Sequence, residues 1–319
     1  MDAFIVMLKN VLLFVALAIP GYLLVKTKVL KAADTSVLSN IMLYLATPFL
    51  VVYSVMDMTF SQNEWILTGW TVVAALAYIA MTFFLSAPFT VREKGDIKKR
   101  GMSRFCASFA NNGFLGIPLA VAVFGAGSPV VFSLIIFNVL NNTAIFTLGA
   151  YLVSGNKKAM SLKKVLLNPV LIGLLAGVLL NVCIISEWLP ESKTFAGHFN
   201  NIVTPLAMTV LGMKLACVNI QSILSSWNGY VVSALKLVIF PVIGVGVLLG
   251  LHSLFPSQVS QALVLAAFIA FATPTASLCS ALADKYDGDS DGAAVYTLLS
   301  TLLSVITLPL LYGLLCVMI

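Results

Sequence analysis

The chain has 319 residues, of which 60% are hydrophobic and only 9% are charged, and its mean hydropathy is +1.04. A chain of this composition cannot cover its surface with polar groups as a soluble protein does, so lipid must be its main solvent. The composition therefore indicates an integral membrane protein and excludes a soluble globular domain.

Long runs without a charged residue define the predicted membrane spans, because about 20 apolar residues cross the hydrocarbon core as a helix. Two runs, 105–156 and 237–283, are too long for one crossing and contain the turn-forming stretches FGAGSP and HSLFPSQ. The first apolar segment is kept as a helix, because it lacks the basic start and the cleavage pattern of a signal peptide. The predicted helices are 3–25, 36–55, 65–88, 105–124, 129–153, 165–185, 196–215, 229–251, 259–283 and 292–316.

The basic residues indicate the orientation of these helices. Lysines and arginines follow the first, third and fifth predicted helices, and Lys214 and Lys285 lie at the ends of the seventh and ninth. Fifteen of the 18 basic residues thus lie on one side, which the positive-inside rule makes cytoplasmic. Both termini are then expected outside the cell membrane. Since the net charge of +6 follows from this topology, it predicts no nucleic-acid partner.

The two halves of the chain, 1–156 and 157–319, are predicted to be repeats of five helices each. A shift of 162 residues places Asn112 against Pro274 and Asn138 against Ser300, although chance matching in apolar sequence is the alternative explanation. Five is an odd number, so the second half must be inserted upside down relative to the first. Inverted repeats of this kind are common in secondary transporters.

Helix breakers lie at the centre of two predicted spans. Span 105–124 contains Gly113, Gly116 and Pro118, and span 259–283 contains Pro274. Proline lacks an N–H and clashes with the carbonyl one turn back, so each helix should break near the membrane midplane. The freed backbone groups must be buried in protein or line a wet cavity, and the positive end of a half-helix favours an anion. A simple proline kink is the alternative.

Few ionisable residues lie inside the predicted helices. Lys9 and Lys236 do, and we expect both to extend their ammonium groups to the membrane surface, with anion binding as the alternative. Asn141 belongs to a glycosylation sequon inside a helix and is assigned no role. The acidic loop from Asp287 lacks the final glutamate of a calcium loop, so we expect it to cap the last helix.

The sequence offers no group of residues typical of an enzyme. Its two histidines, His198 and His252, lie near opposite ends of separate predicted helices, without a nucleophile or a metal-ligand cluster beside them. We therefore expect no catalysis, no metal and no cofactor. A membrane sensor is harder to separate from a carrier, because a carrier fold can bind a ligand without moving it.

Three segments resemble the auxin efflux carrier family, whose architecture is related to that of the bile acid/sodium symporters. They are ANNGFLGIPL at 110–119, ATPTAS at 272–277 followed by ALADKYDGD, and STLLSVITLP at 300–309. The resemblance implies an all-α membrane fold in which predicted helices 4 and 9 are broken and cross. It also implies a transport domain of predicted helices 3–5 and 8–10 that moves against a scaffold of helices 1, 2, 6 and 7.

The same resemblance implies a function. Known members carry small organic anions such as indole-3-acetate, malate or malonate, so a bacterial member is expected to be a secondary transporter of a small carboxylate. Coupling to a proton, coupling to sodium as in the bile acid symporters, exchange without a coupling ion, and homodimerisation all stay open. The substrate-binding residues that the resemblance implies are Asn111, Asn112, Gly113, Gly116, Pro118, Thr273, Pro274 and Thr275 at the crossover, with Asn138, Asn142 and Ser300 in its walls.

Overall fold

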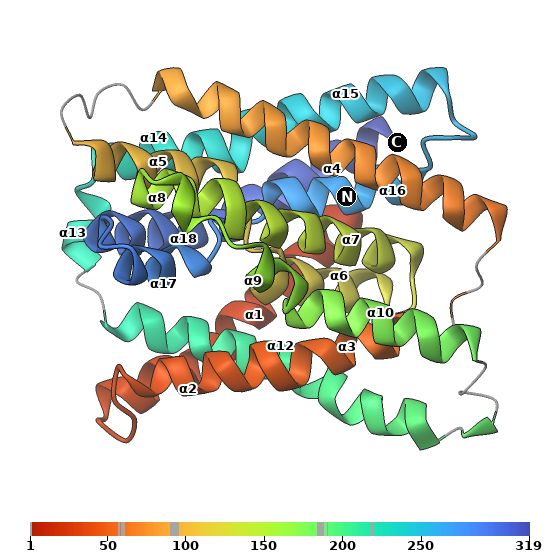
Figure 1. The fold of residues 1–319 in the computed structure, drawn as a ribbon, viewed down its shortest axis with the longest axis horizontal. Coiled ribbons are helices and arrows are strands. Elements are labelled where there is room, and N and C mark those ends of the chain that lie inside the picture. Colours follow the sequence, from red (N-terminus) through yellow and green to blue (C-terminus); the bar gives the residue numbers. More distant parts are fainter. Residues whose placement is uncertain are drawn as a thin grey trace.

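The structure is a computed structural model that describes residues 2–56, 58, 61–89, 96–183, 188–189, 191–217 and 220–319. The described part is helical, apart from one isolated β-bridge between Ala110 and Thr275. Most of the long helices run roughly along the longest axis of the molecule (Figure 1). Seven helical stretches in this part are long and apolar enough to cross a membrane, which confirms an all-helical membrane protein.

The first half of the chain follows the predicted helices closely. Only the broken span begins elsewhere, at Ile97, because the Asp96 carboxylate accepts hydrogen bonds from the N–H groups of Lys98 and Lys99 and caps the helix there. The elements are α1 (Asp2–Lys26), α2 (Asp34–Ile41) continuing into α3 (Thr47–Val55), α4 (Gln62–Phe89), α5 (Ile97–Ser108), a π-helical turn (Asn112–Gly116) continuing into α6 (Ile117–Phe124), and α7 (Pro129–Ala144) with α8 (Ala150–Ser154).

The second half also contains the predicted helices, with one of them broken. Helix α10 begins at Pro169, where the Asn168 side chain accepts from the Val170 N–H and caps the helix. The elements are α9 (Leu162–Leu166), α10 (Pro169–Val182), α12 (Glu191–Cys217), α13 (Ile220–Leu224), α14 (Trp227–Ala234) continuing into α15 (Phe240–Leu254), α16 (Gln261–Ala272), α17 (Leu278–Lys285) and α18 (Ser290–Met318).

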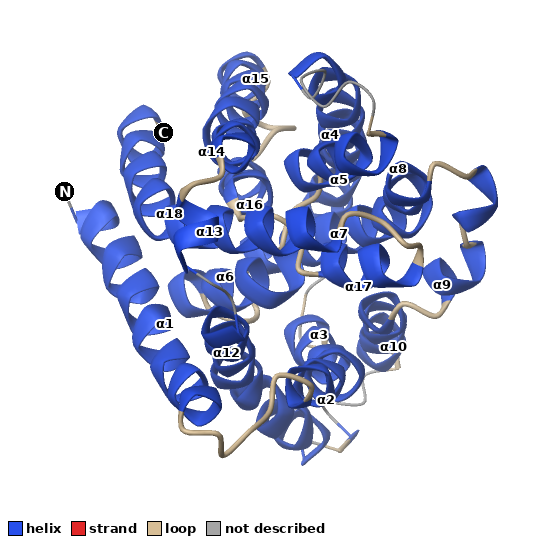
Figure 2. Ribbon diagram, turned by 90° about the vertical axis from the view of Figure 1, so that its left-hand side faces the viewer, coloured by secondary structure: helices blue, strands red, loops and turns tan. Residues whose placement is uncertain are grey.

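The helices pack in two groups. Helix α1 lies on α12, and α3 lies on α10 and α12, whereas α7 packs on α4 and α16, α15 on α16, and α14 on α18. Figure 2 shows α1, α12, α3 and α10 along one side of the molecule and α4, α14, α15 and α16 along the other. Contacts of α1 with α18 and α6 join the groups.

Two glycines bring α1 and α12 together at backbone distance. A Cβ atom on Gly212 would lie 1.9 Å from the carbonyl oxygen of Ala18, and one on Gly21 would lie 2.1 Å from that of Thr209. Small residues at such crossings are a common feature of helix packing in membranes, where close backbone approach replaces the hydrophobic driving force.

A π-helical turn ends two residues before each of three prolines. Met42–Ala46 precedes Pro48, Asn112–Gly116 precedes Pro118, and Leu235–Ile239 precedes Pro241. Proline cannot donate a hydrogen bond and clashes with the carbonyl one turn back, and a wider turn accommodates this defect without ending the helix. Two of these turns contain Asn112 and Lys236, which both take part in the site described next.

Candidate functional site

Two extended segments cross between the halves of the broken spans. The N–H of Asn111 donates to the carbonyl of Pro274 at 2.8 Å, and the N–H of Ala276 donates to the carbonyl of Phe109 at 3.0 Å. In an unbroken helix these N–H groups would bond four residues back along their own chain. A break in each of the two spans is thus confirmed, although the first lies at 109–111 rather than at Pro118, and part of the backbone freed by each break is satisfied by the other.

Side chains satisfy two further backbone groups at the second break. The N–H of Thr275 would normally donate to the carbonyl of Phe271, but it donates to the Ser300 hydroxyl at 3.2 Å. The freed Phe271 carbonyl accepts from the ammonium of Lys236 at 2.7 Å and from the Tyr78 hydroxyl at 3.4 Å. Both ends of one missing helical hydrogen bond therefore have a side-chain partner.

The contact between Lys236 and Phe271 contradicts the expectation that Lys236 extends to the membrane surface. Its side chain is completely buried, whereas Lys9 is exposed. The physical reason is that the break in the second span leaves a buried carbonyl without its helical donor, and an ammonium within reach can satisfy it.

Hydrogen bonds between side chains also hold the crossing together. Thr273 donates from Oγ1 to Asn112 Oδ1 at 2.8 Å, and Asn111 donates from Nδ2 to the Ser277 hydroxyl at 3.0 Å. Gly116 allows close approach, since a Cβ there would lie 3.3 Å from the Thr273 methyl. Asn112, Gly116, Pro118, Thr273, Pro274, Thr275 and Ser300 are therefore brought together as parts of the crossing and its flanks.

Asn141 has a role that the sequence did not indicate. Its Oδ1 accepts from the N–H of Ala110 at 3.2 Å, and its Nδ2 donates to the carbonyl of Ala110 at 2.9 Å. One amide thus satisfies both backbone groups of a residue in the crossing. Only the polar character of Asn141 in an apolar helix could have pointed to it, and the same signal is shared by Asn138 and Asn142.

A small polar cavity adjoins the crossing, with a volume of about 20 Å³, which is enough for one water molecule. Its polar lining consists of Thr47, Asn111, Asn138, Asn142 and Ser277, and Gly113 also borders it. Four predicted residues therefore meet at this cavity. The Nδ2 atom of Asn138 is buried there and has no hydrogen-bond partner within the described part of the chain.

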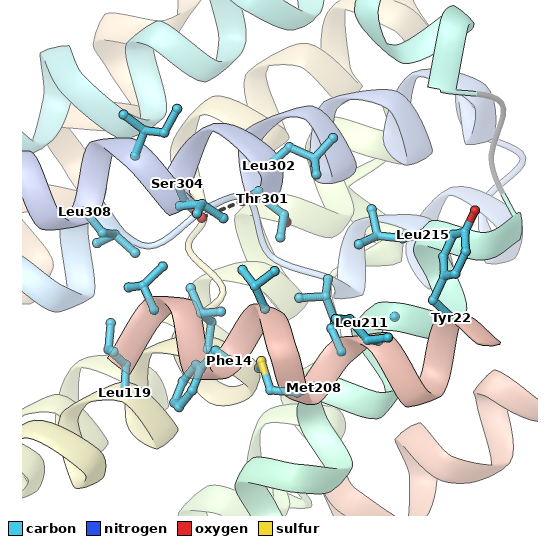
Figure 3. Close-up of a pocket in the computed structure, with 18 residues that line it drawn as sticks. Phe14, Tyr22, Leu119, Met208, Leu211, Leu215, Thr301, Leu302, Ser304 and Leu308 are labelled. Atoms are coloured by element: carbon cyan, nitrogen blue, oxygen red, sulfur yellow. Dashed lines mark hydrogen bonds between the residues drawn. The ribbon is translucent and has the colours of Figure 1, made fainter. Parts of the chain in front are cut away.

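A second cavity, of about 520 Å³, lies between α1, α12 and α18 and is almost entirely apolar (Figure 3). Phe14, Leu119, Met208 and Leu308 contribute to its lining. Ser304, one of its few polar residues, donates its hydroxyl hydrogen to the carbonyl of Thr301 within the same helix, at 2.7 Å. This cavity suits hydrocarbon and offers little to a charged ligand.

An all-helical, multi-pass fold whose broken helices cross beside a buried polar cavity is typical of a membrane transporter. Comparisons agree with this class. The model of the membrane transport protein family matches residues 5–312, and the chain belongs to this family, which is the auxin efflux carrier family. An uncharacterized transporter from Methanothermobacter thermautotrophicus is 29% identical over 321 aligned positions, which cover 95% of this chain and 96% of the relative. The family resemblance seen in the sequence is confirmed.

Proposed function

We propose that this membrane transporter is a secondary carrier of a small organic anion, a carboxylate, which binds at the crossover. The observation that carries the proposal is the unpartnered Nδ2 of Asn138 in the cavity beside Asn111 and Gly113. A buried donor without an acceptor is costly, and a carboxylate oxygen would satisfy it. No aspartate or glutamate is among the described residues that line this cavity.

The direction of the first half-helix supports an anion as well. The helical stretch Asn112–Phe124 begins at the cavity, so its positive end lies beside Asn111 and Gly113. Backbone N–H groups at the start of a helix favour negative charge. The Asn138 amide and the helix end act on the same ligand in this proposal.

The size of the cavity supports a moving binding site. A volume of about 20 Å³ holds a water molecule but not a carboxylate with its carbon chain, so the cavity must widen before substrate enters. We infer that α4–α8 and α14–α18 form a transport domain and that α1, α2, α3, α10 and α12 form a scaffold. The packing of the helices in two groups supports this division, with alternating access as the mechanism.

In this proposal the chain consists of inverted repeats, 1–156 and 157–319, with both termini outside the cell membrane. The basic loops support that orientation through the positive-inside rule.

A sodium-coupled symporter of the bile acid type and a non-transporting sensor are the alternative functions. Measured flux, rather than the fold, distinguishes them from the proposed carrier.

Counterflow in proteoliposomes tests the function. Proteoliposomes that contain the purified protein are loaded with unlabelled acetate, succinate, citrate or benzoate. Entry of the labelled form of the same acid is then measured with and without sodium and at two pH values. Asn138→Leu keeps the side-chain size and removes the donor, so it should weaken anion binding by about 10- to 100-fold. Asn10→Leu is the control, because Asn10 donates to the Val6 carbonyl one turn back within α1.

Saturable flux that Asn138→Leu reduces and Asn10→Leu leaves unchanged supports the proposal. Binding of an anion without flux would favour a sensor instead. Unchanged affinity in Asn138→Leu would refute the assigned site.

A further inference from the structure

A third cavity, of about 630 Å³, opens beside the crossover and is more polar than the cavity of Figure 3. We name it the vestibule. Residues of α2, α12, α17 and α18 line it, among them Asn40, Ser280 and Thr297. Phe114 and Ser277 line both the vestibule and the small crossover cavity. A solute in the vestibule is therefore next to the proposed binding site.

The vestibule lies toward the basic end of the molecule. Ala32 and Ala33, in the connection that carries Lys28 and Lys31, border it, and so does Asp284 beside Lys285. The start of α2, α13 and α17 all lie toward the left-hand end of the molecule in Figure 1. By the positive-inside rule this is the cytoplasmic side, so the vestibule faces the cytoplasm in the proposed orientation.

Lys214 is the one basic side chain among the described residues that line the vestibule. It lies in the last turn of α12, and it also borders a narrow gap of about 10 Å³ shared with Asn111 and Ser277. The lysine is thus positioned between the open vestibule and the crossover.

The cation of Lys214 has no carboxylate partner in the described part of the chain, where the ion pairs join other residues. Its side chain is half-buried, and its ammonium lies 6.0 Å from the centre of the Phe114 ring. Asp284 lines the same vestibule but accepts a hydrogen bond from the Ser290 hydroxyl at 2.7 Å. A partly desolvated cation without an anion, facing a polar cavity, is a binding group for an anion.

We infer that Lys214 binds the carboxylate of the substrate in the vestibule and passes it to the crossover. This inference rests on the proposed function and adds a charged group to it, since the described residues that line the small crossover cavity offer amides, hydroxyls and a helix end but no charged side chain. Lys214 recognises the negative charge, whereas Asn138 holds the anion at the midplane. Selection of an ionised acid over its uncharged analogue therefore depends on Lys214.

Affinities of purified variants test this inference. The probe is whichever of acetate, succinate, citrate and benzoate stabilises the wild type most, compared with its own amide. Lys214→Gln should raise the dissociation constant for the acid by about 10- to 100-fold, the range for one charged hydrogen bond, and leave that for the amide unchanged. Lys214→Arg should keep the preference for the acid.

Lys26→Gln is the matched control, since Lys26 also lies over an aromatic ring, that of Tyr22, at 5.5 Å, but does not line the vestibule. If Lys214→Gln does not fold, Lys214→Met is used in its place. The long apolar side chain of methionine can still lie beside Phe114 but carries no charge. Melting without ligand reports folding for each variant.

The outcomes separate the two proposals. Loss of acid affinity in Lys214→Gln with rescue by arginine supports the inference. Weakening by Asn138→Leu but not by Lys214→Gln overturns the role of Lys214 and leaves the carrier proposal intact. Failure of the wild type to bind any of the four acids overturns the proposed substrate class and this inference with it.

Discussion

The ammonium of Lys236 donates to the carbonyl of Phe271 at 2.7 Å, and both residues are buried. Phe271 lies one residue before the end of α16, so its carbonyl belongs to the negative end of a half-helix. A lysine inside the membrane is expensive, and such residues are usually functional. Lys236 therefore supplies a hydrogen-bond donor where the broken helix needs one.

Replacing Lys236 should reduce transport without lowering thermal stability. Removing the buried lysine relieves a desolvation penalty of several kcal/mol, which offsets the roughly 1.5–3 kcal/mol of its hydrogen bond, and the Phe271 carbonyl keeps the Tyr78 hydroxyl as a donor at 3.4 Å. We therefore expect Lys236→Met to melt at the wild-type temperature or above it, while flux falls at least about tenfold because the end of α16 loses its lysine donor.

The matched control for Lys236→Met is Lys9→Met, since Lys9 is exposed on α1. It should change neither melting nor flux. Wild-type flux in Lys236→Met would show that the buried charge is dispensable for transport.

Asn141 should be important for stability rather than for substrate. Asn141→Ala leaves the N–H and the carbonyl of Ala110 without partners in a buried segment, at about 1–3 kcal/mol for each group. We expect a clear drop in melting temperature in detergent, with little change in the affinity of the protein that stays folded. Asn10→Ala, which removes a bond within a single helix, should melt as the wild type does. An unchanged melting temperature in Asn141→Ala would contradict the assigned contact.

The second break could be predicted from the sequence because its cause is local, since Pro274 lies within 273–277, where the chain leaves the helix. The first break lies at 109–111, before the π-helical turn, so Pro118 marks the broken span but not the place of its break. The cap of the last helix is also local, and it is confirmed, since Asp289 Oδ1 accepts from the N–H of Gly292 at 2.9 Å. Composition and hydropathy were enough for the membrane class.

The contacts that shape the site could not be predicted in the same way. Asn141 meets Ala110 from another helix, and Lys236 meets Phe271 from another helix. In a soluble helix the polar face shows which side points outward, but in lipid both the outer and the inner faces are apolar, so this signal is weak. The sequence could therefore identify Asn138, Asn141 and Asn142 as polar without showing which one has a free donor.

The hydrogen bond between Thr273 and Asn112 allows a sharper test of the crossing. Asn112 was expected to bind substrate, but the structure places its Oδ1 on the Thr273 hydroxyl rather than in the cavity lining. A double-mutant cycle of Asn112→Ala and Thr273→Val should give a coupling energy of about 0.5–1.5 kcal/mol in stability. A variant that keeps its stability but loses anion affinity would instead support direct substrate contact by Asn112.

The close contact of α1 with α12 predicts that a side chain at Gly212 destabilises the protein. A Cβ there would lie 1.9 Å from a backbone oxygen of Ala18, which cannot rotate away, so the helices must separate. Overpacking of this kind costs about 1–3 kcal/mol, and we expect Gly212→Ala to lower the melting temperature accordingly. Gly250→Ala on α15, where a Cβ would meet nothing within 4 Å, should be neutral or slightly stabilising.

The same variant also tests the proposed division of the fold. Because α1 and α12 both belong to the proposed scaffold, separating them leaves the bonds of the crossing, such as that between Asn111 and Pro274, in place. Gly212→Ala protein that stays folded should therefore bind the anion with wild-type affinity but transport it more slowly, because the surface against which the transport domain moves has changed. If Gly212→Ala instead lowers the free energy of unfolding and the free energy of anion binding by similar amounts, the two helix groups form a single unit. Movement of one group against the other would then be refuted as the mechanism.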